Sequence, residues 1–195
     1  LGPGALIELA LQLHGVRGED PWLAALEQAV AGATSGTSRG VLVLGAPGSG
    51  KTVWSQRIAG STRCGLLGAL GVAVRRSARE LAEDLREPGE RSWAALAARR
   101  EPGRAGLFAA LTRTGRLIPV VDGLDEINAS DLAQIEVLLR GCPGVWIATG
   151  RPEMSTRLSE SMVAATLHIE KFTPTLREAL LRGMGRPDLA ARTGS

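Results

Sequence analysis

The sequence predicts a three-layer α/β fold, in which a parallel sheet of about five strands carries helices on both faces. Short apolar runs alternate along the chain with segments of helical pattern, and this order is typical of a parallel sheet. The runs at 41–44 and 117–121 are continuously apolar, as expected of strands covered on both faces. Polar or glycine-rich residues follow each run, and ligands of parallel sheets bind at that carboxyl edge.

The elements are expected in a regular order along the chain. Helices over 4–13 and 21–31 precede a loop at 32–40 that is rich in Gly, Ser and Thr. The expected strands are 41–44, 70–74, 117–121, 144–149 and 163–169. The remaining expected helices run from 51 to about 59, over 77–86, 91–100 and 104–113, from a capping Ser130 to about Arg140, and over 175–183. Pro119 removes a ladder donor from its strand, which predicts a bulge or a local edge there.

The chain length favours one principal domain. Among the 195 residues we expect a helical flank at 1–13, a nucleotide-binding domain at 14–183 and a tail at 184–195. The first residue is Leu, which suggests a piece of a longer protein. Polar residues interrupt the apolar run at 1–13, so we predict no signal peptide. No apolar stretch approaches the roughly 18 residues of a membrane span, so no membrane partner is expected.

Charge and cysteine content favour an ordinary intracellular globular protein. The net charge is +3, but the arginines, including the pairs Arg75-Arg76 and Arg99-Arg100, are interleaved with acids. We interpret them as solvated helix faces rather than as a nucleic-acid surface, so a nucleic-acid partner is not expected. Cys64 and Cys142 lack metal-ligand spacing and are interpreted as buried free thiols in a reducing compartment, which predicts a cytoplasmic location.

A phosphate-binding loop follows the first apolar run. Residues 45–52 match the pattern G-x-x-x-x-G-K-[ST] and are Gly45, Ala46, Pro47, Gly48, Ser49, Gly50, Lys51 and Thr52. The three glycines allow a close approach of the backbone and positive φ angles, so that successive N–H groups can surround an anion. The helix after the loop directs its positive end at the same anion. Lys51 adds a charge near the terminal phosphates, and the Thr52 hydroxyl can bind Mg²⁺.

A second group of polar residues follows the strand at 117–121. Asp122 is expected at the carboxyl end of this strand, where an acid completes the coordination of Mg²⁺ opposite Thr52. Gly123 allows the chain to pass close to the phosphates. Asp125 and Glu126 come next, and a carboxylate there can orient or deprotonate the water that attacks a terminal phosphate. A capping Asp with solvated acids is the alternative.

The run Val-Val-Asp-Gly-Leu-Asp-Glu at 120–126 resembles the acidic motif of NACHT domains, which belong to the STAND class of AAA+-like P-loop NTPases. The resemblance implies the P-loop NTPase fold, Mg²⁺ coordination by Asp122 and catalytic or water-positioning roles for Asp125 and Glu126. It continues at 146–152, Trp-Ile-Ala-Thr-Gly-Arg-Pro, which is similar to a family strand that ends in Thr-Ser-Arg-Pro. The resemblance implies that Arg151 senses the terminal phosphate, as a guanidinium can by bidentate hydrogen bonding; an ordinary surface charge is the alternative.

A weaker similarity at 14–23 resembles the Gly-Arg-Glu segment that precedes many STAND cores. It implies adenine contacts by Val16, Arg17 and Gly18, although a loop that enters a helix is the alternative. His168 is interpreted as a structural or surface residue.

Three functions follow from these motifs. The resemblance implies a signalling switch in which ATP with Mg²⁺ favours an open state that self-associates through this domain in the full-length protein, and ADP favours a closed one. The alternatives are an AAA+ motor that acts on protein or nucleic acid, and a non-catalytic nucleotide-binding scaffold. The residues themselves support binding and hydrolysis of a nucleoside triphosphate. The absence of an Asn-Lys-x-Asp guanine motif favours ATP.

Overall fold

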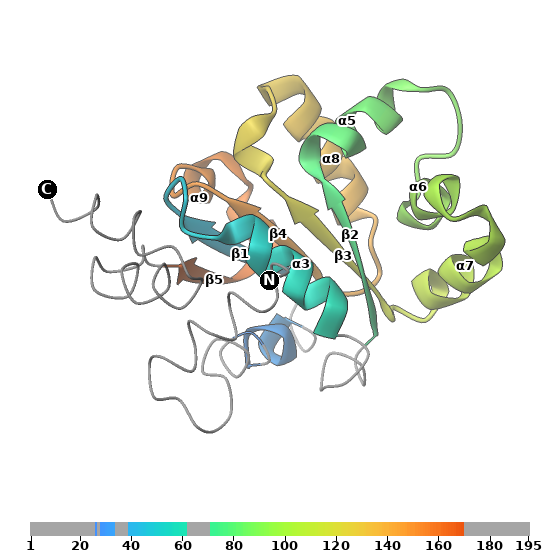
Figure 1. Cartoon of the computed structure of the whole chain (residues 1–195), viewed down its shortest axis with the longest axis horizontal. Helices are drawn as coiled ribbons and strands as arrows, with labels where there is room; N and C mark the ends of the chain where they lie inside the picture. Colours follow the sequence, from blue (N-terminus) through green and yellow to red (C-terminus); the bar gives the residue numbers. More distant parts are fainter. Residues whose placement is uncertain (1–25, 27, 34–38, 62–70, 170–195) are drawn as a thin grey trace, which may run out of the picture.

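The structure is a computed structural model of the chain and describes residues 26, 28–33, 39–61 and 71–169. Strands and helices alternate in this part of the chain, as the sequence predicts (Figure 1). The strands are β1 (Gly40–Gly45), β2 (Val72–Ser77), β3 (Leu117–Asp122), β4 (Trp146–Gly150) and β5 (Val163–Ile169). The helices are α3 (Lys51–Ser61), α5 (Ala78–Arg86), α6 (Trp93–Arg100), α7 (Ala105–Arg113), α8 (Ala129–Arg140) and α9 (Met154–Arg157).

Short 3₁₀ turns complete the described elements: η1 (Pro102–Arg104), η2 (Leu124–Glu126) and η3 (Glu160–Met162). Residues 26 and 28–33 are helical and belong to the helix expected at 21–31. The helices expected at 4–13 and 175–183 lie outside the described residues.

The five strands form one parallel sheet in the order β2-β3-β4-β1-β5. The predicted fold class is therefore confirmed. β1 lies between β4 and β5, with Leu44 paired to Gly150 on one side and to His168 on the other. Because the strands are parallel, their carboxyl ends meet at one edge of the sheet, and this edge brings together the segments after β1, β3 and β4.

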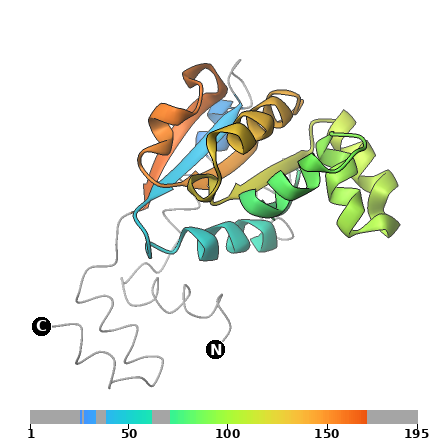
Figure 2. The ribbon, with the colours of Figure 1, turned by 90° about the horizontal axis from the view of Figure 1, so that it is seen from above.

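An apolar core covers each face of the sheet. Successive residues of a strand point to opposite faces, so Val41 and Val43 belong to one core whereas Leu42 and Leu44 belong to the other. The first core includes Trp54 and Ile58 of α3 and helical residues near Val30. The second core receives side chains from α5 to α9, among them Leu81, Trp93, Phe108, Ile135 and Met154. Figure 2 shows α3 on the side of the sheet opposite α8 and α9.

β2 begins and ends later than the sequence predicts. The expected strand was 70–74, but β2 continues through Arg75 and Arg76 to Ser77, and these three residues pair with Val120, Val121 and Asp122 of β3. The interpretation of Arg75 and Arg76 as part of a solvated helix face is therefore wrong. Arg76 is buried, and its charge is compensated there. Its guanidinium forms an ion pair with Asp84 of α5 and donates to the Leu96 carbonyl at 3.0 Å.

The N-cap of α8 is Asn128 rather than the expected Ser130. The Asn128 side-chain oxygen accepts a hydrogen bond from the Asp131 backbone N–H at 2.9 Å, and the helix begins at Ala129. Ser130 lies within the first turn and donates its hydroxyl proton to the same Asn128 oxygen at 2.7 Å. Asn and Ser are both good capping residues, so the sequence pattern does not distinguish them.

Pro119 lies in an interior strand without a bulge in the described pairing. It pairs with Val74 of β2, whereas pairing of β3 with β4 begins one residue later at Val120. Of the two expected alternatives, the local edge is the one observed, because the β4 side of β3 is not yet paired at this residue.

Cys142 forms no disulfide within the described part of the chain. It is half-buried at the end of α8, and its Sγ lies 3.5 Å from the Leu138 carbonyl oxygen. Burial raises the pKa of the Cys142 thiol to about 12, so the group stays protonated at neutral pH. Cys64 lies outside the described residues. The cytoplasmic location remains a prediction.

Candidate functional site

The phosphate-binding loop joins β1 to α3, where the sequence places it. β1 ends at Gly45 and α3 begins at Lys51. Gly48 and Gly50 adopt φ angles of 76° and 90°, which L side chains rarely adopt. Gly45 differs from the expectation of positive φ, because it is part of the extended strand. Lack of space favours glycine at this position instead, because a Cβ on residue 45 would lie 2.4 Å from the Ser49 Oγ.

Lys51 folds back over the loop that precedes it. Its Nζ donates to the Gly45 carbonyl at 2.6 Å and to the Ala46 carbonyl at 3.1 Å. These acceptors are neutral dipoles, and an anionic phosphate is a stronger partner for an ammonium group. The cation is therefore held beside the loop, next to the space that a phosphate would occupy, without a carboxylate partner in the described residues.

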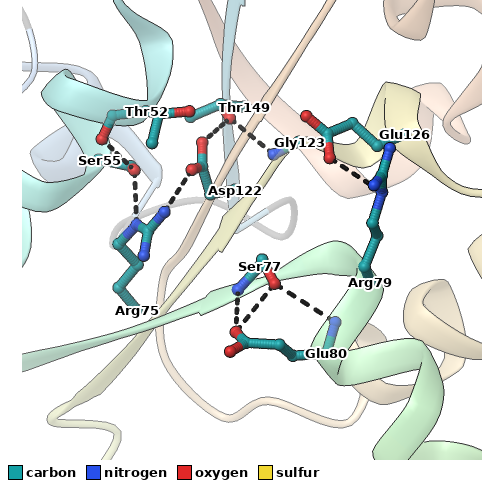
Figure 3. A network of polar contacts seen from close by, with 10 residues as sticks. All are labelled: Thr52, Ser55, Arg75, Ser77, Arg79, Glu80, Asp122, Gly123, Glu126 and Thr149. Carbon is teal, nitrogen blue, oxygen red and sulfur yellow. Dashed lines mark hydrogen bonds and ion pairs between the residues drawn. The ribbon is translucent and has the colours of Figure 1, made fainter.

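Asp122 is buried at the carboxyl end of β3, with 6% of its side chain exposed. Figure 3 shows that each of its carboxylate oxygens has a protein donor. Oδ1 accepts the Thr149 hydroxyl proton at 2.7 Å, and Oδ2 accepts from the Arg75 guanidinium at 2.5 Å. Two neighbouring strands, β4 and β2, therefore orient this carboxylate from opposite sides.

Thr149 also fixes the turn that follows β3. Its Oγ1 accepts from the Gly123 backbone N–H at 2.9 Å, so one fully buried hydroxyl joins β4 to the first residue after Asp122. Gly123 has a φ of 81° and a ψ of 48°, a left-handed conformation that starts η2. The sequence predicts this glycine from the close passage of the chain, and the structure adds the conformational requirement.

The two acids of η2 are paired with arginines from different elements. Asp125 is largely buried, and its Oδ2 lies 2.8 Å from the Nε of Arg151, which directly follows β4. Its Oδ1 is buried without a hydrogen-bond partner in the described residues. Glu126 is half-exposed, and its Oε2 lies 3.2 Å from the Nε of Arg79 on α5.

These residues line one cavity of about 380 Å³ at the carboxyl edge of the sheet. It joins the phosphate-binding loop to the acidic segment and to Arg151. Its lining consists of Pro47, Gly48, Gly50, Lys51, Thr52, Val53, Asp122, Gly123, Asp125, Glu126 and Arg151. Segments that are far apart in the sequence thus converge on one space, as the order of the parallel strands requires. The expected adenine contacts Val16, Arg17 and Gly18 lie outside the described residues.

The residues of this cavity fit a magnesium ion bound to phosphates. Thr52 and Asp122 both line it and offer hydroxyl and carboxylate oxygens, the ligand atoms that Mg²⁺ prefers. Asp125 also lines this cavity, and one of its carboxylate oxygens is buried without a hydrogen-bond partner in the described residues. At Gly48 and Gly50 a Cβ would find no atom within 4 Å, so the loop leaves open space beside its backbone.

Sequence reasoning missed Thr149 and Arg75 as members of the site. In the sequence, Thr149 belongs to the strand end that resembles the family's Thr-Ser-Arg-Pro but has no predicted role in the site, and Arg75 is interpreted as part of a solvated helix face. The available signal was a polar residue at the expected end of each strand, because such ends meet at one edge of a parallel sheet. Arg75 directly follows the strand expected at 70–74, so this signal was available for it as well.

The chain belongs to the NACHT family, because the model of the NACHT domain matches residues 39–187. This confirms the resemblance and defines the chain as the nucleotide-binding core of an NTPase. No curated protein is similar enough to the chain to count as a match.

Several solved structures share the fold at low sequence identity. A chain of the HORMA:CdnC:Trip13 complex of E. coli MS115-1 matches with a TM-score of 0.53 and 14% identity, over 100% of this chain and 78% of that chain. A chain of Drosophila ORC bound to GC-rich DNA and Cdc6 matches with a TM-score of 0.56 and 10% identity, over 92% of this chain and 33% of that chain. The present chain thus spans about a third of the Drosophila chain. In the described residues, no helix is long and apolar enough to cross a membrane.

Proposed function

We propose that this domain binds ATP or ADP with Mg²⁺, hydrolyses ATP slowly and serves as the nucleotide-operated core of a STAND-type signalling switch. The observation that carries the proposal is the single cavity into which the phosphate-binding loop, Asp122, the η2 acids and Arg151 all converge. Family membership supports the nucleotide-binding core. The switch, the slow turnover and the self-association of the full-length protein belong to the proposal.

In this proposal the loop binds the phosphates through its backbone N–H groups. Lys51 would leave the Gly45 and Ala46 carbonyls for the β- and γ-phosphates, which gives its charge an anionic partner. Thr52 and Asp122 would hold Mg²⁺, which neutralises phosphate charge when bound. Val16, Arg17 and Gly18 are the proposed adenine contacts, within a domain proposed to begin at residue 14 and to end at residue 183.

Asp125 and Glu126 divide the proposed hydrolytic work. Glu126 is half-exposed and lines the cavity, where its carboxylate can orient a water molecule once it leaves Arg79. Asp125 is more deeply buried and engages Arg151 through one oxygen. Arg151 would exchange this carboxylate for the terminal phosphate and so report whether the phosphate is present.

Substitution of Lys51 tests the proposal directly. Lys51→Ala should abolish measurable binding of a fluorescent ATP analogue, because the phosphates lose their nearest cation. The fold should survive, because the Lys51 ammonium bonds only to two loop carbonyls. The matched control is Arg104→Ala, which removes an exposed cation paired with Glu101 outside the cavity lining. Unchanged affinity in Lys51→Ala would overturn the assignment of the loop.

A turnover assay separates the switch from the motor. The developing charge on the γ-phosphate needs a further cation that a partner often supplies, so we expect turnover of the isolated domain below about one per second. Phosphate release should remain proportional to protein over a hundredfold range, with a monomeric signal in light scattering. Fast turnover that rises steeply as rings assemble would favour an AAA+ motor, and binding without any turnover would favour a scaffold.

A further inference from the structure

Arg75 is an arginine of β2 that is linked by hydrogen bonds to both proposed metal ligands, directly to one and indirectly to the other. Its Nη2 donates to Asp122 Oδ2 at 2.5 Å, and its Nε donates to the Ser55 Oγ at 2.8 Å (Figure 3). Ser55 in turn donates to the Thr52 carbonyl at 2.9 Å. One guanidinium is thereby connected directly to Asp122 and, through a single serine, to Thr52.

The position of Arg75 is set by the pairing of strands. Val120 of β3 is its partner in the sheet register, two residues before Asp122, and Ser55 belongs to α3 on one face of the sheet. The Arg75 side chain is 24% exposed, compared with 51% for Arg151 and 68% for Arg79. Of these three arginines around the site, Arg75 is therefore the most firmly enclosed.

A buried carboxylate needs a compensating positive charge, since an isolated charge in the protein interior is costly. In this arrangement Arg75 supplies that charge to Asp122 before any metal arrives. A divalent cation at the same carboxylate meets a guanidinium that repels it and that occupies one carboxylate oxygen. The arginine and the metal are competitors for Asp122.

We propose that Arg75 is a positioning residue that holds Asp122 in the nucleotide-free state and leaves Oδ2 when the magnesium–nucleotide complex binds. This inference rests on the proposed function, in which Asp122 serves Mg²⁺. Its consequence is that Arg75 weakens the part of nucleotide binding that depends on Mg²⁺ and leaves the metal-free part unchanged. Binding of the magnesium–nucleotide complex therefore includes the displacement of the Arg75 guanidinium from Asp122, whereas binding of the metal-free nucleotide does not.

The geometry allows this exchange without loss of the orientation of Asp122. Oδ1 stays bonded to Thr149, whose hydroxyl is fully buried and anchored to the Gly123 N–H. The guanidinium can keep its hydrogen bond to Ser55 through Nε while Nη2 leaves Asp122. The Arg75 side chain is partly exposed, so it has room to move away from Oδ2.

The test compares nucleotide affinity with and without the metal. A fluorescent ATP analogue is titrated in EDTA and in Mg²⁺. The dissociation constant in EDTA divided by the dissociation constant in Mg²⁺ gives the metal dependence, so a higher ratio means that Mg²⁺ strengthens binding more. Arg75→Gln should raise this ratio about tenfold or more, since tenfold requires only a small part of the repulsion between neighbouring charges. The matched control is Arg86→Gln, which breaks a similar pair, 2.6 Å from the buried Asp131, outside the cavity lining. It should leave the ratio unchanged.

Two further measurements keep the result decisive. Ser55→Ala removes one anchor of the guanidinium by a small change and should raise the ratio by about threefold. In the absence of nucleotide, Mg²⁺ alone should raise the melting temperature of Arg75→Gln more than that of the wild type. An unchanged ratio in both variants would overturn the inference. A lower ratio would also overturn it, because it would place Arg75 on the bound phosphates instead.

The outcome separates this inference from the proposed function. If the wild type and Lys51→Ala bind the analogue equally, or neither binds it, the proposed function fails. If the wild type binds and Lys51→Ala does not, the proposed function stands. The ratios in Arg75→Gln and Ser55→Ala then test only the inference about Arg75.

Discussion

The buried hydroxyl of Thr149 joins Asp122 to Gly123, and Thr149→Val removes it with little change in shape. The hydroxyl donates to Asp122 Oδ1 at 2.7 Å and accepts from the Gly123 N–H at 2.9 Å. Valine fills the same space, so the substitution opens no cavity and isolates the two hydrogen bonds.

The expected loss follows from the two partners left behind. A hydrogen bond to a charged group contributes about 1.5–3 kcal/mol, and a buried N–H without a partner costs about 1–3 kcal/mol. Gly123 and Asp122 are both buried, so we expect a loss of about 3 kcal/mol in the free energy of unfolding. For a chain of this size this corresponds to a fall of about 6–12 °C in melting temperature.

Urea denaturation and thermal melts of the nucleotide-free protein measure this loss, and Thr149→Ser is the matched control. The serine variant keeps the hydroxyl and should lose only about 1 kcal/mol for the missing methyl group. The valine variant should also weaken analogue binding in Mg²⁺ more than in EDTA, because Asp122 loses an anchor. A valine variant as stable as the serine variant, with unchanged metal dependence, would refute the reasoning.

Three further predictions concern the acids of the domain. Asp122→Asn should weaken binding of the ATP analogue in Mg²⁺ more than in EDTA, because only the metal loses a charged ligand; equal losses would argue against Asp122 as the metal acid. Glu126→Gln should leave binding near normal and reduce phosphate release by about 10²–10⁴-fold, whereas normal release in this variant together with loss in Asp125→Asn would assign the role to Asp125. In the capping box of α5, hydrogen bonds from the Ser77 side chain and backbone lower the pKa of Glu80 below its usual 4.5. These bonds therefore stabilise the folded state above about pH 4.5, and the stabilisation is lost as the pH falls through the lowered pKa of Glu80 in the folded protein. Urea melts at pH 7 should show a loss of about 1 kcal/mol in Ser77→Ala, and the difference from the wild type should shrink at pH 3; a constant difference would contradict the linkage.

The sequence is sufficient for the phosphate-binding loop and the acidic segment because their chemistry is local. A loop of glycines between a strand and a helix requires neighbouring residues only, and Gly48 and Gly50 have the positive φ that the pattern predicts. The strand before Asp122 is also recognisable, because burial on both faces leaves a continuous apolar run. The resemblance to NACHT domains begins with the acidic segment at 120–126, and membership of this family is confirmed.

The ends of elements were less accurate where polar residues serve a buried purpose. The expected strand at 70–74 ends before Arg75, and the pair Arg75-Arg76 is interpreted as solvated, yet Arg76 is buried against Asp84. The cap of α8 was shifted because Asn128 and Ser130 are equally suitable by type. The buried position of Arg76 depends on an acid from another element, and the start of α8 depends on which side chain forms the capping hydrogen bond.

The sequence alone is enough to predict the fold class, the loop at 45–52 and the acids that follow β3. Which residues surround Asp122 depends instead on how the strands pack side by side. The order β2-β3-β4 places Arg75 on one side of this carboxylate and Thr149 on the other, 47 and 27 positions away along the chain. Strand order and register are properties of long-range packing, and a linear pattern of residue types does not encode which strand ends become neighbours.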